Sequence, residues 1–146
     1  MGKVTVITGG TSGIGRGIAE KILAESAKAD RIFVTYGHDE NKAQAFLENL
    51  PLEKRSQVIL MKADMSSYED MMDFVAELKD QADHIDWLVS NAGVSTYAKY
   101  EDYTFEEWTR IVNTNLSVPV FMVKELRPMM SEGGSILFTG SYAGQQ

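Results

Sequence analysis

The chain has 146 residues, of which 44% are apolar and 24% are charged, and none is cysteine. This is the balance of one ordinary globular domain, which at this length can bury about 70% of its unfolded surface. The formal charge of −7, with no Lys or Arg cluster against it, disfavours nucleic acids and anionic membranes as partners. The lack of cysteine excludes disulfides, and two histidines disfavour a histidine-based metal site. We expect one domain over residues 1–146, with no metal, nucleic-acid or membrane partner.

The N-terminal stretch MGKVTVITGG holds too short an apolar run for a signal peptide or a membrane span. Val6 also stands where the myristoylation pattern requires Ser or Thr. We therefore expect a cytoplasmic protein.

Apolar spacing along the chain predicts alternating strands and helices. The predicted strands cover residues 4–7, 31–36, 56–64, 85–93 and 134–139, and the fourth of these ranges includes the turn into which the strand runs. The predicted helices cover residues 14–23, 40–50, 68–78 and 105–130. Strands that alternate with helices of this length indicate an α/β fold, in which helices cover both faces of a parallel sheet. In such doubly wound sheets, ligands bind beyond the carboxyl ends of the strands.

A glycine-rich turn, TGGTSGIG over residues 8–15, joins the first strand to the first helix. Glycines allow positive φ and let a ligand approach the backbone, while the free amides and positive end of a helix suit a pyrophosphate. A tight turn that binds nothing is the alternative, because glycines also serve purely steric needs. The three glycines Gly9, Gly13 and Gly15, placed between strand and helix, favour a phosphate-binding turn.

This turn resembles the Thr-Gly-x-x-x-Gly-x-Gly motif of the short-chain dehydrogenase/reductase family, and four later motifs follow in the family's order. These are AD at residues 63–64, SNAG at 90–93, NTNLSVP at 113–119 and TGSYAG at 139–144. The resemblance runs from residue 3 to 144, and 3-oxoacyl carrier-protein reductases show a similar pattern. It implies a Rossmann fold, a five-stranded parallel sheet in the order 3-2-1-4-5, with the family's sixth and seventh strands missing.

The resemblance also implies that a nicotinamide dinucleotide binds along the carboxyl ends of the strands. We assign to this cofactor Gly9, Thr11, Ser12, Gly13, Ile14, Gly15, Thr35, His38, Asp64, Met65, Asn91, Ala92 and Gly93. In the family, the AD motif, here Ala63 and Asp64, lies where adenine is contacted. Asp64 could instead cap the helix that follows, as could Ser66 or Ser67. Asn91 could be a turn residue bonded to the backbone, and in the family the structural and cofactor roles coexist at this motif.

A catalytic role is implied for Asn115 by its place in the NTNLSVP motif. Pro119, four residues later, has no amide hydrogen, so the carbonyl of Asn115 loses its usual helical partner and can hold a water. In the family, such a water belongs to a relay that carries protons between the active-site lysine and solvent. A plain proline kink is the alternative explanation of this sequence.

By the same resemblance, Ser141 is catalytic and hydrogen-bonds the substrate carbonyl, while a Tyr-x-x-x-Lys motif supplies the proton donor and the lysine that tunes it. No tyrosine in the sequence has a lysine four residues later. We therefore expect the 146-residue chain alone to reduce nothing at a measurable rate. It is either the cofactor-binding N-terminal part of an NAD(P)-dependent oxidoreductase or a natural, non-catalytic dinucleotide-binding or interaction module. Retention of Asn115 and Ser141 favours the oxidoreductase.

The segment VTYGHDE after the second strand bears on the choice between NAD and NADP. NAD enzymes of this type usually carry an acid at the end of that strand, and here the first acid, Asp39, comes slightly late. Ser12 stands where NADP-preferring relatives often place a basic residue, so His38 and Lys42 are the nearby cations. We expect NADP(H) to be preferred over NAD(H). The small carbonyl or alcohol substrate stays open among 3-oxoacyl thioesters, steroids, sugars and simple ketones.

The fifth predicted strand carries Ile136, Leu137 and Phe138, an apolar run typical of an interior parallel strand. Without a sixth strand beside it, this strand becomes an open edge with no lysine or proline to discourage pairing. We expect a homo-oligomer that forms through this edge, through the exposed face of the 105–130 helix, or through both.

Overall fold

The computed structural model describes residues 1–145, which contain a five-stranded parallel sheet. Its strands are β1 (Val4–Ile7), β2 (Arg31–Tyr36), β3 (Val58–Lys62), β4 (Ile85–Ser90) and β5 (Met130–Phe138). They are arranged in the order β3-β2-β1-β4-β5, which confirms the predicted topology.

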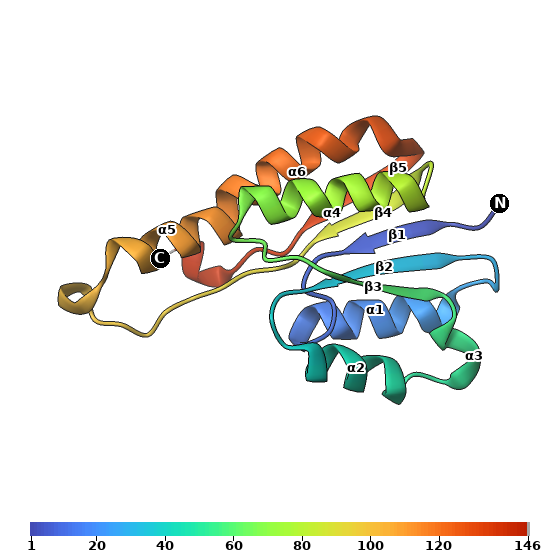
Figure 1. Cartoon of the computed structure of the whole chain (residues 1–146), viewed down its shortest axis with the longest axis horizontal. Helices are drawn as coiled ribbons and strands as arrows, with labels where there is room; N and C mark the ends of the chain where they lie inside the picture. Colours follow the sequence, from blue (N-terminus) through green and yellow to red (C-terminus); the bar gives the residue numbers. More distant parts are fainter. Residues whose placement is uncertain (146) are drawn as a thin grey trace.

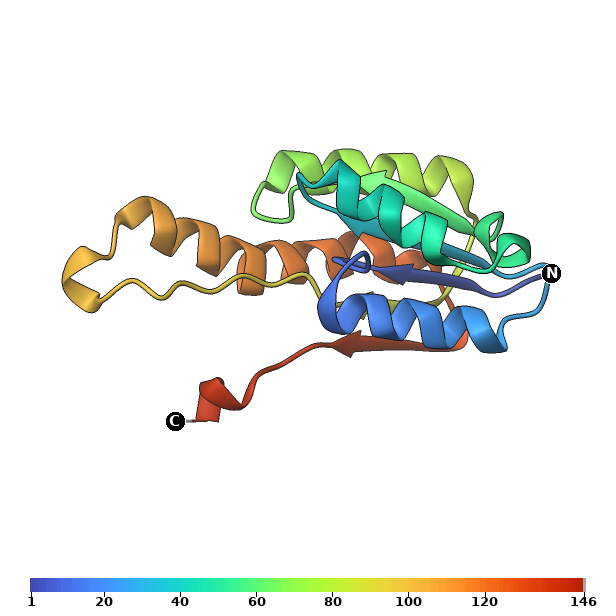
Figure 2. The ribbon, with the colours of Figure 1, turned by 90° about the horizontal axis from the view of Figure 1, so that it is seen from below.

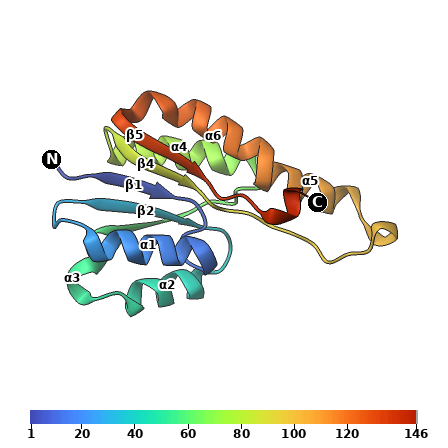
Figure 3. The ribbon, with the colours of Figure 1, turned by 180° about the vertical axis from the view of Figure 1, so that it is seen from behind.

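Helices cover both faces of this sheet, as a doubly wound α/β fold requires (Figures 1 and 3). One face carries α1 (Gly13–Glu25) and α2 (Glu40–Asn49), and the short α3 (Leu52–Arg55) leads into β3. The other face carries α4 (Tyr68–Gln81) and α6 (Val118–Leu126), while α5 (Phe105–Val112) extends beyond the end of the sheet. Short 3₁₀ turns lie at Tyr100–Asp102, Arg127–Met129 and Tyr142–Gln145.

The hydrophobic core forms two layers, one on each side of the sheet. Val6 of β1 packs with Phe74 and Met122 under α4 and α6, whereas its neighbour Ile7 packs with Phe46 under α1 and α2. Successive side chains of a strand point to opposite faces, so a strand covered on both sides is buried along its whole length and is mostly apolar, as in β1, where Thr5 is the buried polar residue. This explains the buried run over Val4–Ile7.

The helix predicted over residues 105–130 is interrupted by a π-helical turn at Asn113–Ser117. There the amide of Val118 donates to the carbonyl of Asn113, five residues earlier. Pro119 lies in the first turn of α6, where the missing amide hydrogen is tolerated. The irregularity around Asn115 is therefore a π-helical turn, which the proline alone did not predict.

Two strand boundaries also differ from the prediction. The predicted 56–64 strand is shorter, and β3 has one fully buried residue, Met61, because it lies at the edge of the sheet. β5 starts at Met130, which the prediction placed in a helix. Residues 131–135 are polar or glycine and give no apolar period, and the register with β4 is irregular there. At the other edge of the sheet, Leu137 and Phe138 of β5 are about half exposed, as predicted for an open edge strand.

A cluster of charged side chains joins β4 to the start of β1 at the amino ends of the strands. His84 lies between two carboxylates, with Nδ1 2.7 Å from Asp83 Oδ1 and Nε2 3.3 Å from Asp86 Oδ2. Asp86 also accepts a hydrogen bond of 2.8 Å from the amide of Val4. The hydrogen bond to Asp83 and the charge of Asp86 outweigh burial and raise the pKa of His84.

We predict that His84→Gln removes a pH-dependent part of the stability. Because the pKa of His84 is raised above its ordinary 6.5 in the folded chain, its contribution is complete below about pH 6.5 and is lost as pH rises through the folded pKa. The Tm of the wild type should exceed that of the variant by about 1–3 °C near pH 6, and the difference should shrink toward pH 9. Thermal melts followed by circular dichroism measure this, and a pH-independent difference would contradict it.

Candidate functional site

A pocket of about 490 Å³ opens at the carboxyl ends of the strands. The residues that follow each of the five strands contribute to its wall. Of the residues assigned to a cofactor from sequence, the lining includes Gly9, Ser12, Ile14, Thr35, His38, Asp64, Met65, Asn91, Ala92 and Gly93. Thr11, Gly13 and Gly15 belong to the same glycine-rich turn but are not on the lining, and neither are Asn115 and Ser141.

The lining also contains Ala63, from the AD motif, and residues that were not assigned to the cofactor from sequence, namely Gly37, Ser66, Val94, Arg110, Thr114 and Thr139. Most of them adjoin or belong to the quoted motifs, so their place in the pocket could have been predicted from those motifs. Arg110 belongs to no quoted motif. Its one link to them is that it lies one helical turn before Thr114 of the NTNLSVP motif.

Close packing fixes the glycine-rich turn between β1 and α1. Gly9 has a φ of +64°, and its amide donates to Thr35 Oγ1 at 3.1 Å. A Cβ on Gly15 would lie 2.3 Å from the Gly9 carbonyl oxygen and 2.4 Å from Asn91 Nδ2. The first turn of α1 therefore packs directly against the turn and the end of β4, at a distance that only glycine allows.

The N-terminus of α1 faces the pocket without a side-chain cap. Ser12 is the N-cap residue, its side chain makes no capping hydrogen bond, and the first turn of α1 carries no acid. Both Ser12 and Ile14 line the pocket. The free amides and the positive end of the helix dipole are therefore available to an anionic group.

A hydrogen-bond network around Thr8 and Asn91 joins the ends of three strands. The amides of Asn91 and Ala92 each donate to Thr8 Oγ1 at 3.0 Å. Asn91 Nδ2 donates to the carbonyls of Thr8 and Gly9 at 3.2 Å, and Asn91 Oδ1 accepts from Thr139 Oγ1 at 2.9 Å. Asn91 thus has the structural role that its sequence suggested, while the part played by Thr8 was missed.

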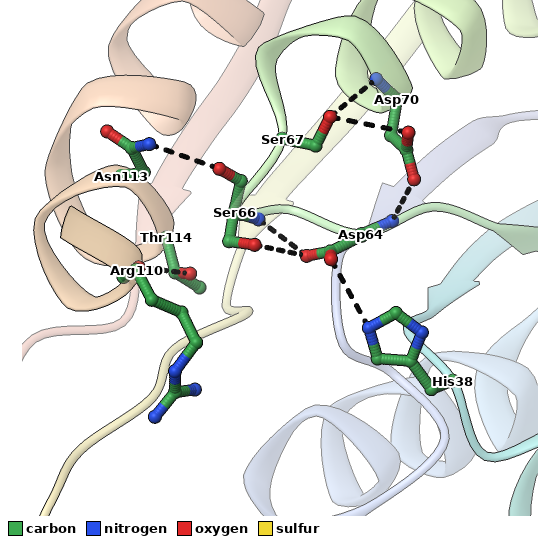
Figure 4. Close-up of polar contacts among 8 residues, drawn as sticks. All are labelled: His38, Asp64, Ser66, Ser67, Asp70, Arg110, Asn113 and Thr114. Carbon is green, nitrogen blue, oxygen red and sulfur yellow. Dashed lines mark hydrogen bonds and ion pairs between the residues drawn. The ribbon is translucent and has the colours of Figure 1, made fainter. Parts of the chain in front are cut away.

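Asp64 lies in the pocket wall between Ser66 and His38 (Figure 4). Its carboxylate accepts from the amide of Ser66 at 2.8 Å and from Ser66 Oγ at 2.6 Å, and it lies 3.2 Å from His38 Nε2. The cap of α4 is Ser67, which accepts from the Asp70 amide, so the suggestion that Asp64 caps this helix is wrong. Burial alone would raise the pKa of Asp64, but the bonds from Ser66 and the charge of His38 lower it, so this carboxylate is ionised at neutral pH.

The two residues predicted to be catalytic lie away from the pocket lining. Asn115 Oδ1 accepts from the Val94 amide at 2.9 Å, and Asn115 Nδ2 donates to the Val94 carbonyl at 2.8 Å. Asn115 therefore holds the segment after β4 against the π-helical turn. Ser141 Oγ accepts from the Ala143 amide at 3.2 Å, in the exposed segment that leads away from the helices after β5 (Figure 2).

Two further properties of the described residues bear on the site. Residues 1–145 contain no group of three or more His, Cys, Asp or Glu side chains placed to hold a metal ion. In the same residues, no helix combines the length and the apolar character needed to cross a membrane.

Comparison with known proteins identifies the family. The family described as short chain dehydrogenase matches residues 3–146. Because the match covers nearly the whole chain and the fold agrees with it, the chain belongs to the short-chain dehydrogenase family.

Individual relatives are similar over the same region. Versicolorin reductase 1 of Aspergillus parasiticus is 31% identical over 140 residues, which are 96% of this chain and 52% of that reductase. Acetoacetyl-CoA reductase of Rhizobium meliloti is 31% identical over 134 residues, 92% of this chain and 52% of that enzyme. A short chain dehydrogenase of Burkholderia cenocepacia, solved in complex with NADP, matches with a TM-score of 0.87 at 26% identity, covering 100% of this chain and 58% of its own. The chain spans about half the length of the curated relatives it matches.

We predict that Gly15→Ala lowers the free energy of unfolding by about 2 kcal/mol or more, because the new Cβ would meet the Gly9 carbonyl oxygen at 2.3 Å. Gly17→Ala is the matched control, since a Cβ at this position in α1 meets nothing within 4 Å. There, removing a glycine from a helix should raise stability by up to about 1 kcal/mol. Urea unfolding measures both variants, and equal effects would show that Gly15 does not make the close contact.

Proposed function

We propose that the chain is the dinucleotide-binding part of an NAD(P)-dependent oxidoreductase that moves a hydride between a nicotinamide cofactor and a small carbonyl or alcohol substrate. The observation that carries this proposal is the uncapped N-terminus of α1 facing a pocket at the carboxyl ends of the strands. Membership of the short-chain dehydrogenase family and a solved relative in complex with NADP support it. A non-catalytic module is less well supported, because the relatives that match nearly the whole chain include reductases.

The residues of the pocket fit such a cofactor. The volume of about 490 Å³ lies in the usual range for small-molecule sites. The amides of residues 9–15 would hold the pyrophosphate, the carboxylate of Asp64 and the backbone of Met65 the adenine, and residues 91–93 the adjoining ribose. When bound, the nicotinamide ring donates or accepts the hydride. The chain's own part is to bind and orient the cofactor beside the strand ends.

Asn115 and Ser141 belong to the proposed catalytic machinery by family resemblance. We propose that the Ser141 hydroxyl hydrogen-bonds the substrate carbonyl, and that Asn115 positions the segment after β4 through its two bonds to Val94. The proton donor and its lysine would come from a Tyr-x-x-x-Lys motif, which the 146-residue sequence does not contain. We also propose a cytoplasmic location, in keeping with the absence of cysteine.

The cofactor is proposed to be NADP(H) rather than NAD(H). The acid after β2, Asp39, caps α2 by accepting from the Lys42 amide at 2.9 Å, and it lies 3.7 Å from Lys42 Nζ. It is thus engaged outside the pocket. His38 contacts Asp64 but lines the pocket with a side chain that is 81% exposed, so it can also face a 2′-phosphate. Calorimetry at pH 6.5 should give about tenfold tighter binding of NADP⁺ than of NAD⁺. His38→Gln should narrow that ratio, and tighter binding of NAD⁺ by the wild type would reverse the preference.

We predict that the 146-residue chain does not oxidise NADPH at a measurable rate with any of the open substrate classes. A positioned proton donor alone contributes about 10²- to 10⁴-fold to such a reaction, and the sequence lacks the family's donor motif. The assay follows absorbance at 340 nm with 3-oxoacyl thioesters, sugars, steroids and simple ketones. Sustained oxidation that disappears in Ser141→Ala would refute this prediction.

We propose that the chain self-associates through exposed apolar surface. Ile136, Leu137 and Phe138 on the edge strand β5 are 36–56% exposed, and Leu116 and Phe121 on the helical side are 62% and 43% exposed. A stable dimer should bury more than about 1,000 Å². Light scattering after size exclusion should give a mass above that of the monomer. The variant that restores the monomer mass, Phe138→Lys or Phe121→Lys, identifies the surface that is used. A monodisperse monomer at high concentration would contradict self-association.

A further inference from the structure

Arg110, in the last turn of α5, lines the dinucleotide pocket on the side opposite His38 (Figure 4). Its backbone carbonyl accepts from Thr114 Oγ1 at 2.7 Å. Its guanidinium makes no hydrogen bond or ion pair with any residue from 1 to 145. A cationic side chain with five donors is therefore left available at the pocket wall.

The acidic residues near Arg110 on α5 form no ion pair with its guanidinium in the described chain. Glu107 accepts from Thr96 Oγ1 at 3.0 Å and forms a capping box with Thr104 at the start of the helix. Glu106, one helical turn before Arg110, makes no ion pair with it in the described chain. Neither carboxylate therefore neutralises the Arg110 guanidinium in residues 1–145.

Side-chain bonds from the π-helical turn hold Arg110 beside the pocket. Asn113 Nδ2 donates to the Ser66 carbonyl at 3.2 Å, which ties the helix to the segment after β3. Asn115 bonds to Val94 in both directions and ties the helix to the segment after β4. The backbone of Arg110 is therefore fixed against two walls of the pocket, while its exposed guanidinium can turn toward a ligand.

The charges in the pocket favour an anionic partner for Arg110. Among the described lining residues, Arg110 is the one Lys or Arg and Asp64 is the one carboxylate. Asp64 is already bonded to Ser66 and paired with His38, so Arg110 does not balance it. A guanidinium presents a planar fork of donors that matches a phosphate.

We infer that Arg110 binds a phosphate group of the dinucleotide. The inference rests on the proposed function and adds a residue from α5, outside both the glycine-rich turn and the segment after β2. The ligand offers two sources of this chemistry. One is the pyrophosphate, which NAD(H) and NADP(H) share, and the other is the 2′-phosphate, which NADP(H) alone carries.

The experiment is calorimetric titration of the wild type, Arg110→Gln, Arg110→Lys and Arg127→Gln with NADP⁺ and with NAD⁺ at fixed, low ionic strength. Arg127 is exposed on a 3₁₀ turn outside the pocket, so its variant removes the same charge at a remote site. Arg110→Gln should weaken binding about tenfold, and Arg127→Gln should leave it unchanged within about twofold. Raising the salt concentration should weaken binding by the wild type more than by Arg110→Gln.

The pattern of loss identifies the phosphate. If Arg110→Gln loses affinity for NADP⁺ alone, Arg110 binds the 2′-phosphate. If it loses affinity for both nucleotides equally, Arg110 binds the pyrophosphate. Partial recovery in Arg110→Lys supports a role for the charge itself. Binding of both nucleotides by Arg110→Gln within about twofold of the wild type, in a variant whose circular dichroism is unchanged, overturns the inference and leaves the proposed function intact. A wild type that binds neither nucleotide overturns the proposed function, and this inference falls with it.

Discussion

The hydrogen bonds between Thr8 and Asn91 hold together the strand ends on which the rest of the site depends. At this point β1 and β4 leave the sheet, so their amides and carbonyls lose their ladder partners and need others. The Thr8 hydroxyl accepts from the backbone amides of Asn91 and Ala92, and the side-chain amide of Asn91 donates to the carbonyls of Thr8 and Gly9. Gly15 packs against the same atoms, so this network also sets the position of the α1 N-terminus.

An acidic chain can bind an anionic cofactor because the relevant charges are local. The formal charge of −7 is spread over the surface, where salt screens it over about 10 Å. In the pocket, the carboxylate of Asp64 is paired with His38, while the α1 N-terminus is uncapped and Arg110 is unpaired within the described chain. The groups that can bind an anion are therefore gathered in the pocket, which neither the composition nor the isoelectric point indicates.

The strand order and most of the pocket wall could be predicted because they follow from local signals, namely apolar runs and the glycines or polar residues directly after them. The π-helical turn could not, since one extra residue in a helical turn barely changes the apolar spacing. Thr8 was missed because its partners come 83 and 84 residues later. Arg110 resembles any charged residue on a helix surface, and its place at the pocket depends on the bond from Asn113 to Ser66, 47 residues away.

The most direct test of the account is to map dinucleotide binding on the ¹⁵N-labelled chain by NMR. On addition of NADP⁺, the backbone amide shifts should change most at residues 9–15, 64–66 and 91–93, where the structure brings the glycine-rich turn, Asp64 and Asn91 to one pocket. The amide shifts around His84, at the opposite ends of the strands, should not change. Changes confined to that opposite end, or no changes at saturating NADP⁺, would contradict the assignment of this pocket as the dinucleotide site.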